Sequence, residues 1–151
     1  MRKVTVFAFL SIFSLLVIIP LLLINRLTQN EIHYKTVKLS GMTIKAEIAD
    51  TPLKQTVGLM SKKTLPLNGG MLFIFNEEKH HGIWMRNMSF PIDIVWINKN
   101  LEIVDIVESA QPCRINCPIY LPDEKASYVL EVNAGFSKKN QLQIGDMISI
   151  S

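Results

Sequence analysis

The chain contains two cysteines, Cys113 and Cys117, which lie four positions apart between Pro112 and Pro118. In an oxidising compartment, two thiols this close in a proline-bounded loop most simply form a disulfide. The enclosed loop is short, so the loop-length relation gives about 2 kcal/mol of stabilisation, and the bond would act as a local staple. A pair of metal thiolates and a redox pair remain as alternatives. However, the C-x-x-x-C spacing differs from the usual C-x-x-C redox spacing, and no second close ligand pair accompanies it.

Two carboxylates, Asp93 and Glu131, lie inside apolar runs of the sequence. Asp93 interrupts the run Ile92–Ile97 and would share one strand face with Val95 and Ile97. A carboxylate among apolar neighbours needs hydrogen-bond donors, because burying it without a partner is costly. In the structural interpretation, each carboxylate caps a turn or accepts hydrogen bonds from buried amides. In the functional interpretation, the two line a pocket that binds a sugar or peptide, or they act as general acid and base.

An aromatic and an amide side chain precede Asp93 at short spacing. Trp84 would offer a ligand an aromatic platform, and Asn87 would donate hydrogen bonds. Unusual residues that gather on loops are typical of binding surfaces, and the loop Pro112–Tyr120 is the second such segment. The residues for which we expect a binding role are Trp84, Met85, Asn87, Asp93 and Tyr120.

Two histidines and two methionines between positions 80 and 88 have the side chains that suit Cu(I). Adjacent side chains on a strand point to opposite faces, so His80 and His81 would not face one ion. Methionine is also a common filler of hydrophobic cores. We therefore expect neither a metal centre nor a cofactor at this segment.

Composition and motifs argue against several classes of function. The sequence has no G-x-S-x-G, H-E-x-x-H or P-loop motif, so we expect no enzymatic activity of these kinds. Without Arg2 and Lys3, 14 of the 16 basic residues remain against 13 acidic residues. Such a balance, with no basic stripe, predicts neither nucleic-acid binding nor strong attraction to anionic lipid.

Short apolar runs separated by turn residues predict a mostly β fold. Ser40 and Gly41 would connect the first two strands as a hairpin. Thr51 can cap a short helix that runs to about Gly58 and packs Leu53 and Val57 inward. We expect a compact antiparallel sandwich or barrel with one or two short helices. The expected strands cover residues 36–39, 43–49, 71–75, 83–85, 92–97, 101–107, 128–132 and 147–150.

Residues 4–24 carry no charge. As a helix they would extend about 32 Å at ~1.5 Å per residue, which matches a hydrocarbon core of roughly 30 Å. We expect an N-terminal transmembrane helix; the alternative is a cleaved signal peptide, whose apolar region is usually shorter. Arg2 and Lys3 before the segment, against Arg26 after it, favour a domain outside the cytoplasm, on the periplasmic or extracellular face.

The expected organisation has three parts. Residues 1–24 form the membrane anchor or signal peptide, residues 25–35 form a polar tether, and residues 36–151 form one β-rich domain. The exported part is long enough to bury a single core without a metal or a disulfide framework.

A series of short motifs gives the β-rich part a resemblance to a known family. They occur in the order G-L-M, G-M-L-F-x-F, W-M-x-N, P-I-D-I, P-C, C-P-x-Y, Y-V-L-E, A-G and G-D, from Gly58 to Asp146. Together they resemble the family catalogued as domain of unknown function 192. The resemblance implies a compact, β-rich domain, often exported or anchored, with no established activity. The family commonly carries a basic residue before G-L-M, where this chain has Val57.

These observations lead to one expected function and two alternatives. We expect a membrane-tethered accessory or ligand-binding domain outside the cytoplasm, with the membrane and an envelope ligand or protein as partners. The first alternative is an envelope hydrolase that uses Asp93 and Glu131 as a carboxylate pair. The second is metal or thiol handling through Cys113 and Cys117.

Overall fold

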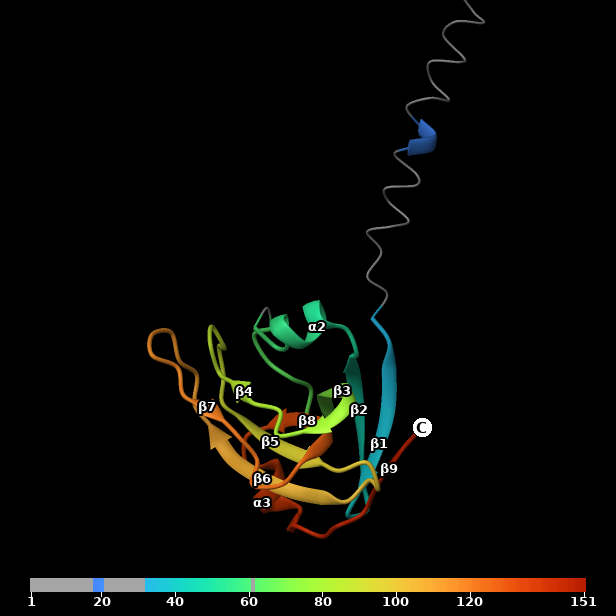
Figure 1. Ribbon diagram of the computed structural model, residues 1–151, viewed down its shortest axis with the longest axis vertical. Helices are drawn as coiled ribbons and strands as arrows, with labels where there is room; N and C mark the ends of the chain where they lie inside the picture. Colours follow the sequence, from blue (N-terminus) through green and yellow to red (C-terminus); the bar gives the residue numbers. More distant parts are fainter. Residues whose placement is uncertain (1–17, 21–31, 61) are drawn as a thin grey trace, which may run out of the picture. The chain divides into compact units, whose positions relative to one another are not determined.

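The computed structural model describes residues 18–20, 32–60 and 62–151 (Figure 1). The chain divides into two units, Met1–Ile32 and His33–Ser151. Apart from residues 18–20, the expected membrane anchor lies outside the described residues, as does most of the expected tether. Among the residues that are described, none of the helices has the length and apolar character needed to cross a membrane.

The second unit is mostly β-strand, which confirms the expected fold class at this level. The described residues of this unit form nine strands and two short helices. In chain order these are β1 (Tyr34–Leu39), β2 (Met42–Ala49), α2 (Pro52–Val57), β3 (Gly69–Lys79), β4 (Ile83–Trp84), β5 (Ile92–Ile97), β6 (Ile103–Ala110), β7 (Ile119–Tyr120), β8 (Ala126–Asn133), α3 (Phe136–Lys139) and β9 (Ile148–Ile150).

Seven of these strands form one curled sheet in the order β6-β5-β8-β3-β2-β1-β9. The two remaining strands, β4 and β7, form a separate antiparallel pair. The expected arrangement was antiparallel, but β2 and β3 pair in parallel. Parallel neighbours need a crossover of a dozen or more residues, and residues 50–68, which include α2, provide it. The sheet is therefore mixed. It also curls into the shape of a half-barrel.

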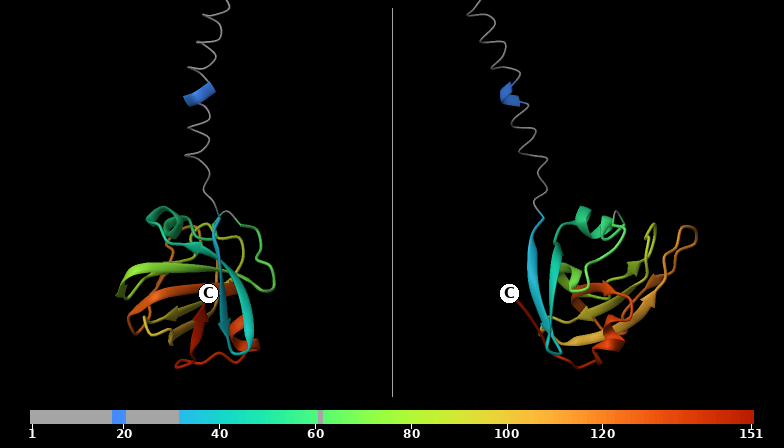
Figure 2. Two further views of the ribbon diagram at one scale, coloured as in Figure 1. Left: turned by 90° about the vertical axis from the view of Figure 1, so that its right-hand side faces the viewer. Right: turned by 180° about the vertical axis from the view of Figure 1, so that it is seen from behind.

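The two ends of the curled sheet approach each other (Figure 2). The Ile103 amide donates to the Asp146 carbonyl at 2.9 Å, and the Ile148 amide donates to the Leu101 carbonyl at 2.9 Å. The enclosed face carries the inner core, which draws on both ends of the sheet. Its buried residues are Val37, Leu39, Ile44, Ala46, Ile48, Leu72, Val95, Ile97, Ile103, Leu130, Val132, Phe136 and Ile148.

The opposite face of the sheet carries the outer core. Side chains of β3, β5 and β8 pack there against Leu59 and against the segment from Ile83 to Met88. Its buried residues are Ala49, Leu59, Met71, Phe73, Ile83, Met85, Met88, Ile92, Ile94, Trp96, Ala110, Ala126 and Val129. Both faces of β5 are therefore buried, as a run that is apolar except for Asp93 indicates.

Helix α2 begins as expected but packs differently. Thr51 accepts a hydrogen bond from the Lys54 amide, which confirms the predicted cap. The prediction that Leu53 and Val57 face inward is wrong, because their exposed fractions are 67% and 40%. The helix lasts only six residues, and Gln55 attaches it to the sheet instead. The Gln55 amide donates to the carbonyls of Ala49 and Ile74 at 3.3 and 2.9 Å.

Candidate functional site

Asp93 lies on the inner face of β5 and is fully buried. Its Oδ1 accepts hydrogen bonds from the amides of Ser109 at 2.9 Å and Gly135 at 3.0 Å. Its Oδ2 accepts one from the Ser137 amide at 2.7 Å. The carboxylate thus joins β5 to the end of β6 and to the start of α3. This arrangement corresponds to the structural interpretation of Asp93, in which it satisfies buried amides.

Glu131 lies on β8, next to β5, but points to the other face of the sheet. Asp93 is paired with Val132, an inner-core residue, whereas Glu131 is paired with Ile94 of the outer core. Directly paired residues share a face, and successive residues alternate between faces. The sheet therefore separates the two carboxylates, and both are buried. The hypothesis of a hydrolase with Asp93 and Glu131 as a pair in one open cleft is wrong.

Glu131 lines a small pocket on the outer face, with a volume of about 40 Å³. Three separate parts of the chain form its walls: α2 and the residues that follow it, the segment around β4, and the central strands β3 and β8. Two of the wall residues, Val57 and Trp84, are 40% and 39% exposed, so the pocket opens to the surface. The lining residues are Gln55, Thr56, Val57, Gly58, Leu59, Met60, Phe73, Gly82, Ile83, Trp84, Met88 and Glu131.

The Glu131 carboxyl is the chemically distinctive group of this pocket. Its Oε2 is buried and has no hydrogen-bond partner within the part of the chain that the structure describes. Two other polar side chains of the lining already have partners, because Gln55 donates to backbone carbonyls and Thr56 donates to the Pro52 carbonyl at 2.8 Å. Desolvation by burial raises the pKa of Glu131 to about 8. At neutral pH the carboxyl is therefore mostly protonated and can donate a hydrogen bond.

Of the residues predicted to bind a ligand, only Trp84 lines this pocket together with Glu131. Met85 is fully buried, and its carbonyl accepts from the Cys113 amide at 3.0 Å. Asn87 has a φ of 57°, and its amide donates to the Cys113 carbonyl at 2.9 Å. Tyr120 is paired with Ile83 on the two-stranded sheet. These residues position the segment that carries Trp84.

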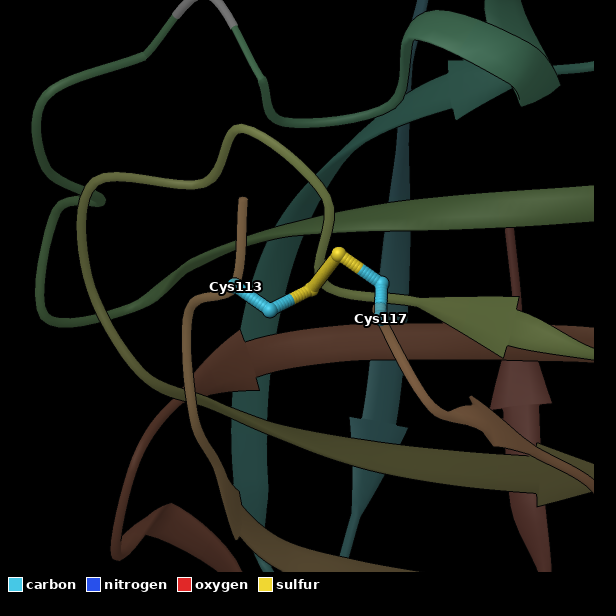
Figure 3. The surroundings of a disulfide bond; sticks show 2 residues. All are labelled: Cys113 and Cys117. Atoms are coloured by element: carbon cyan, nitrogen blue, oxygen red, sulfur yellow. A yellow bond between two sulfur atoms is a disulfide. The ribbon is translucent and has the colours of Figure 1, made fainter. Parts of the chain in front are cut away.

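Cys113 and Cys117 form a disulfide with a Cα–Cα distance of 5.5 Å (Figure 3). The bond closes the loop that precedes β7, and Cys113 is linked by backbone hydrogen bonds to Met85 and Asn87. The structure therefore has the predicted staple, and it holds the loop against the Trp84 segment. Paired cysteines have no thiolates to offer a metal ion, so the metal interpretation does not apply to this state.

His80 and His81 turn to different partners. The His80 Nδ1 lies 3.0 Å from the Pro122 carbonyl oxygen, and the His81 Nε2 lies 2.8 Å from the Glu77 carbonyl oxygen. The His81 ring also stacks on Phe75. Within the described residues no three His, Cys, Asp or Glu side chains gather as a metal site would require.

A second, larger pocket of about 190 Å³ lies beside α3. Its polar wall residues include Asn133 and Asn140, whose amide groups donate to the carbonyls of Pro66 and Phe136, each at 2.8 Å. The Glu131 pocket remains the stronger candidate for a site, because it contains a buried carboxyl oxygen that has no partner among the described residues.

The fold and pocket define a small β-rich domain in which, among the described residues, one buried carboxyl oxygen has no hydrogen-bond partner. The chain belongs to the DUF192 family, described as "Uncharacterized ACR", whose pattern matches residues 35–150. This match confirms the family inferred from the motifs. The UPF0127 protein TK1120 of Thermococcus kodakarensis is 31% identical over 107 residues, which are 70% of this chain. The matched part spans 64% of that relative's length.

Two solved structures share the fold. A crystal structure from Sinorhizobium meliloti 1021 has a TM-score of 0.71 and 31% identity, and the match covers 79% of this chain and 95% of that one. A protein of unknown function from Novosphingobium aromaticivorans has a TM-score of 0.69 and 28% identity, with coverages of 78% and 84%. The first match covers nearly the whole of the related chain, so that chain consists almost entirely of the fold seen in this β-rich unit.

Sequence reasoning did not identify the pocket walls around Gly58 and Phe73. A signal was nevertheless present, because four of the family motifs contribute to the lining. G-L-M supplies Gly58 to Met60, G-M-L-F-x-F supplies Phe73, W-M-x-N supplies Trp84, and Y-V-L-E supplies Glu131. Val57, at the position where the family commonly has a basic residue, also lines the pocket.

Proposed function

We propose that this protein is a membrane-tethered binding domain that works outside the cytoplasm and holds the uncharged, oxygen-bearing end of an apolar ligand in the Glu131 pocket. The observation that carries the proposal is the buried Glu131 Oε2, which has no partner among the described residues. A buried polar group without a partner costs free energy, and a ligand that supplies the partner recovers that cost.

The expected placement rests on two features of the chain. The uncharged run at residues 4–24 is long enough to span a bilayer. The Cys113–Cys117 disulfide is the state that an oxidising compartment favours. Both features are consistent with a domain held at the outer face of a membrane.

The chemistry of the pocket supports an uncharged ligand end. Phe73, Ile83 and Met88 make the walls apolar, and burial is the only cause of the raised pKa of Glu131. A protonated carboxyl donates to a carbonyl or ether oxygen without placing a charge in an apolar site. The volume of about 40 Å³ admits one small group, so the rest of the ligand must extend past Trp84 and Val57.

Three probes with similar tails test this assignment: 2-pentanone, n-butylammonium and butyrate. The unit His33–Ser151 is titrated with each at about pH 6.5 and about pH 9.5, and the NMR shifts of the Trp84 indole and the Glu131 carboxyl carbon are followed. We expect the ketone to shift both signals at the lower pH and to lose at least tenfold in affinity at the higher pH. The reason is that an ionised Glu131 has no proton to donate.

Two variants control this experiment. Glu131→Leu should abolish the ketone response, whereas Glu108→Leu removes an exposed glutamate and should leave it unchanged. Binding of n-butylammonium at about pH 6.5 that is at least as tight as that of 2-pentanone would contradict an uncharged ligand end and show that the site accepts cations. A ketone response that is equal in Glu131→Leu would exclude Glu131 from the site.

A further inference from the structure

Large apolar side chains are exposed on α2, β4 and β7 and on the residues that flank β7, and two of them, Val57 and Trp84, line the Glu131 pocket. Their exposed fractions run from 39% for Trp84 to 85% for Ile115. We call this set the apolar rim. It consists of Leu53, Val57, Trp84, Ile115, Ile119 and Leu121.

Much of the rim forms one continuous surface. Trp84 is paired with Ile119 across the two-stranded sheet, so their side chains share a face. The Ile119 and Leu121 side chains both lie against Gly82, where a Cβ would come within 2.6 Å of Ile119. Val57 and Trp84 both line the pocket. A cluster of exposed apolar residues of this size is typical of a surface that binds a membrane or another protein.

The rim lies toward the end of the unit at which the chain enters it. The Ile48 amide donates to the His33 carbonyl at 2.9 Å, and Ile48 lies at the end of β2, just before α2. Figures 1 and 2 show that α2 and the loop before β7 extend toward the same end as the start of β1. Residues 25–32 separate this point from the uncharged run and can span at most about 28 Å at ~3.5 Å per residue.

The charges beside the rim are few and mixed. The Arg86 guanidinium lies 5.6 Å from the centre of the Trp84 ring, and Arg114 belongs to the loop before β7. Lys54 is paired with Asp50 at 3.2 Å. Acidic residues follow Leu121 at positions 123 and 124. Binding of a partner to the rim must therefore depend mainly on apolar side chains. Tryptophan and arginine side chains suit the depth of a membrane at which lipid headgroups meet acyl chains.

We infer that the apolar rim docks on the lipid surface next to the proposed membrane anchor, with Trp84 in the headgroup region, so that the Glu131 pocket opens toward the bilayer. The inference rests on the proposed tether for its geometry. It also specifies the source of the ligand, because a pocket that faces lipid receives its ligand from the membrane.

Tryptophan fluorescence tests the docking with little ambiguity. The described residues contain two tryptophans, and Trp96 is fully buried with its indole bonded to the His81 carbonyl at 2.8 Å. Trp84 is therefore the one that responds to a change at the surface. The unit His33–Ser151 is mixed with vesicles of phosphatidylethanolamine and phosphatidylglycerol, and the full chain is reconstituted into the same lipids. We expect a blue shift and quenching by brominated acyl chains in both preparations.

Two variants separate docking from other effects. Trp84→Phe should remove the response and leave the Trp96 emission. Ile119→Ser combined with Leu121→Ser should lower vesicle binding by tenfold or more while the 2-pentanone response is kept, because neither residue lines the pocket. Unchanged Trp84 emission in vesicles and in the reconstituted chain would overturn the inference, and would show that something other than lipid covers the rim. Such a failure would leave the ketone result, and with it the proposed pocket, intact.

Discussion

Replacing Glu131 with glutamine is expected to make the domain more stable at pH 7, by up to about 3 kcal/mol. The carboxyl has a pKa of 4.5 in the unfolded chain and about 8 when buried in the fold. At pH 7 it must gain a proton on folding, which costs free energy. Glutamine has a similar shape and no proton to gain. Urea unfolding of the two proteins, followed by circular dichroism, measures the difference.

The raised pKa of Glu131 also fixes the direction in which the stability changes with pH. The native state holds a proton that the unfolded state releases, so the Glu131 contribution is most favourable below about pH 4.5 and is lost as the pH rises to about 8. Between these values the unfolding equilibrium should change by roughly tenfold per pH unit through this group. Glu131→Gln should lack this part of the pH dependence. Parallel pH profiles for the wild type and Glu131→Gln would refute a buried, protonated carboxyl, and Glu108→Gln, on the exposed side of β6, is the matched control.

Replacing Asp93 with alanine should have the opposite and larger effect. Three amides, those of Ser109, Gly135 and Ser137, lose their acceptor, and each buried unpaired donor costs about 1–3 kcal/mol. The sum, about 3–9 kcal/mol, is comparable with the whole stability of many domains. Asp93→Ala should therefore be largely unfolded or should melt far below the wild type in calorimetry.

Asparagine at position 93 is the informative control. It can retain an oxygen for Ser109 and Gly135, but its NH₂ group would face the Ser137 amide, which also donates. We expect an intermediate loss of about 1–3 kcal/mol, equivalent to one broken bond. If Asp93→Ala melted with the wild type, the carboxylate would not be the link between β5, β6 and α3.

The local elements could be predicted because their signals are local. Alternation and turn residues placed the β1–β2 hairpin, and the run that is apolar except for Asp93 placed β5 with the bounds that the structure has. Thr51 and Pro52 placed the start of α2. Strand β7 has only two residues and α3 has four, so neither carries enough residues for a periodic pattern.

The pairing of the strands and the pocket could not be predicted in the same way. Asp93 and Glu131 look alike in sequence, as single carboxylates in apolar strands, but the register of β5 and β8 places them on opposite faces. Asp93 accepts hydrogen bonds from three amides, whereas the Glu131 Oε2 has no partner among the described residues. The exposure of Val57 has the same origin, because a helix of one or two turns is oriented by its contacts at the sheet edge rather than by its own pattern.

Glu131 keeps its proton at neutral pH because, among the described residues, no partner reaches it in an apolar pocket. The most direct measurement is an NMR titration of the Glu131 carboxyl carbon in His33–Ser151. We expect a midpoint near 8, and a lower one in Val57→Lys, which brings an ammonium group to the pocket. A wild-type midpoint near 4.5, unchanged by Val57→Lys, would contradict the account.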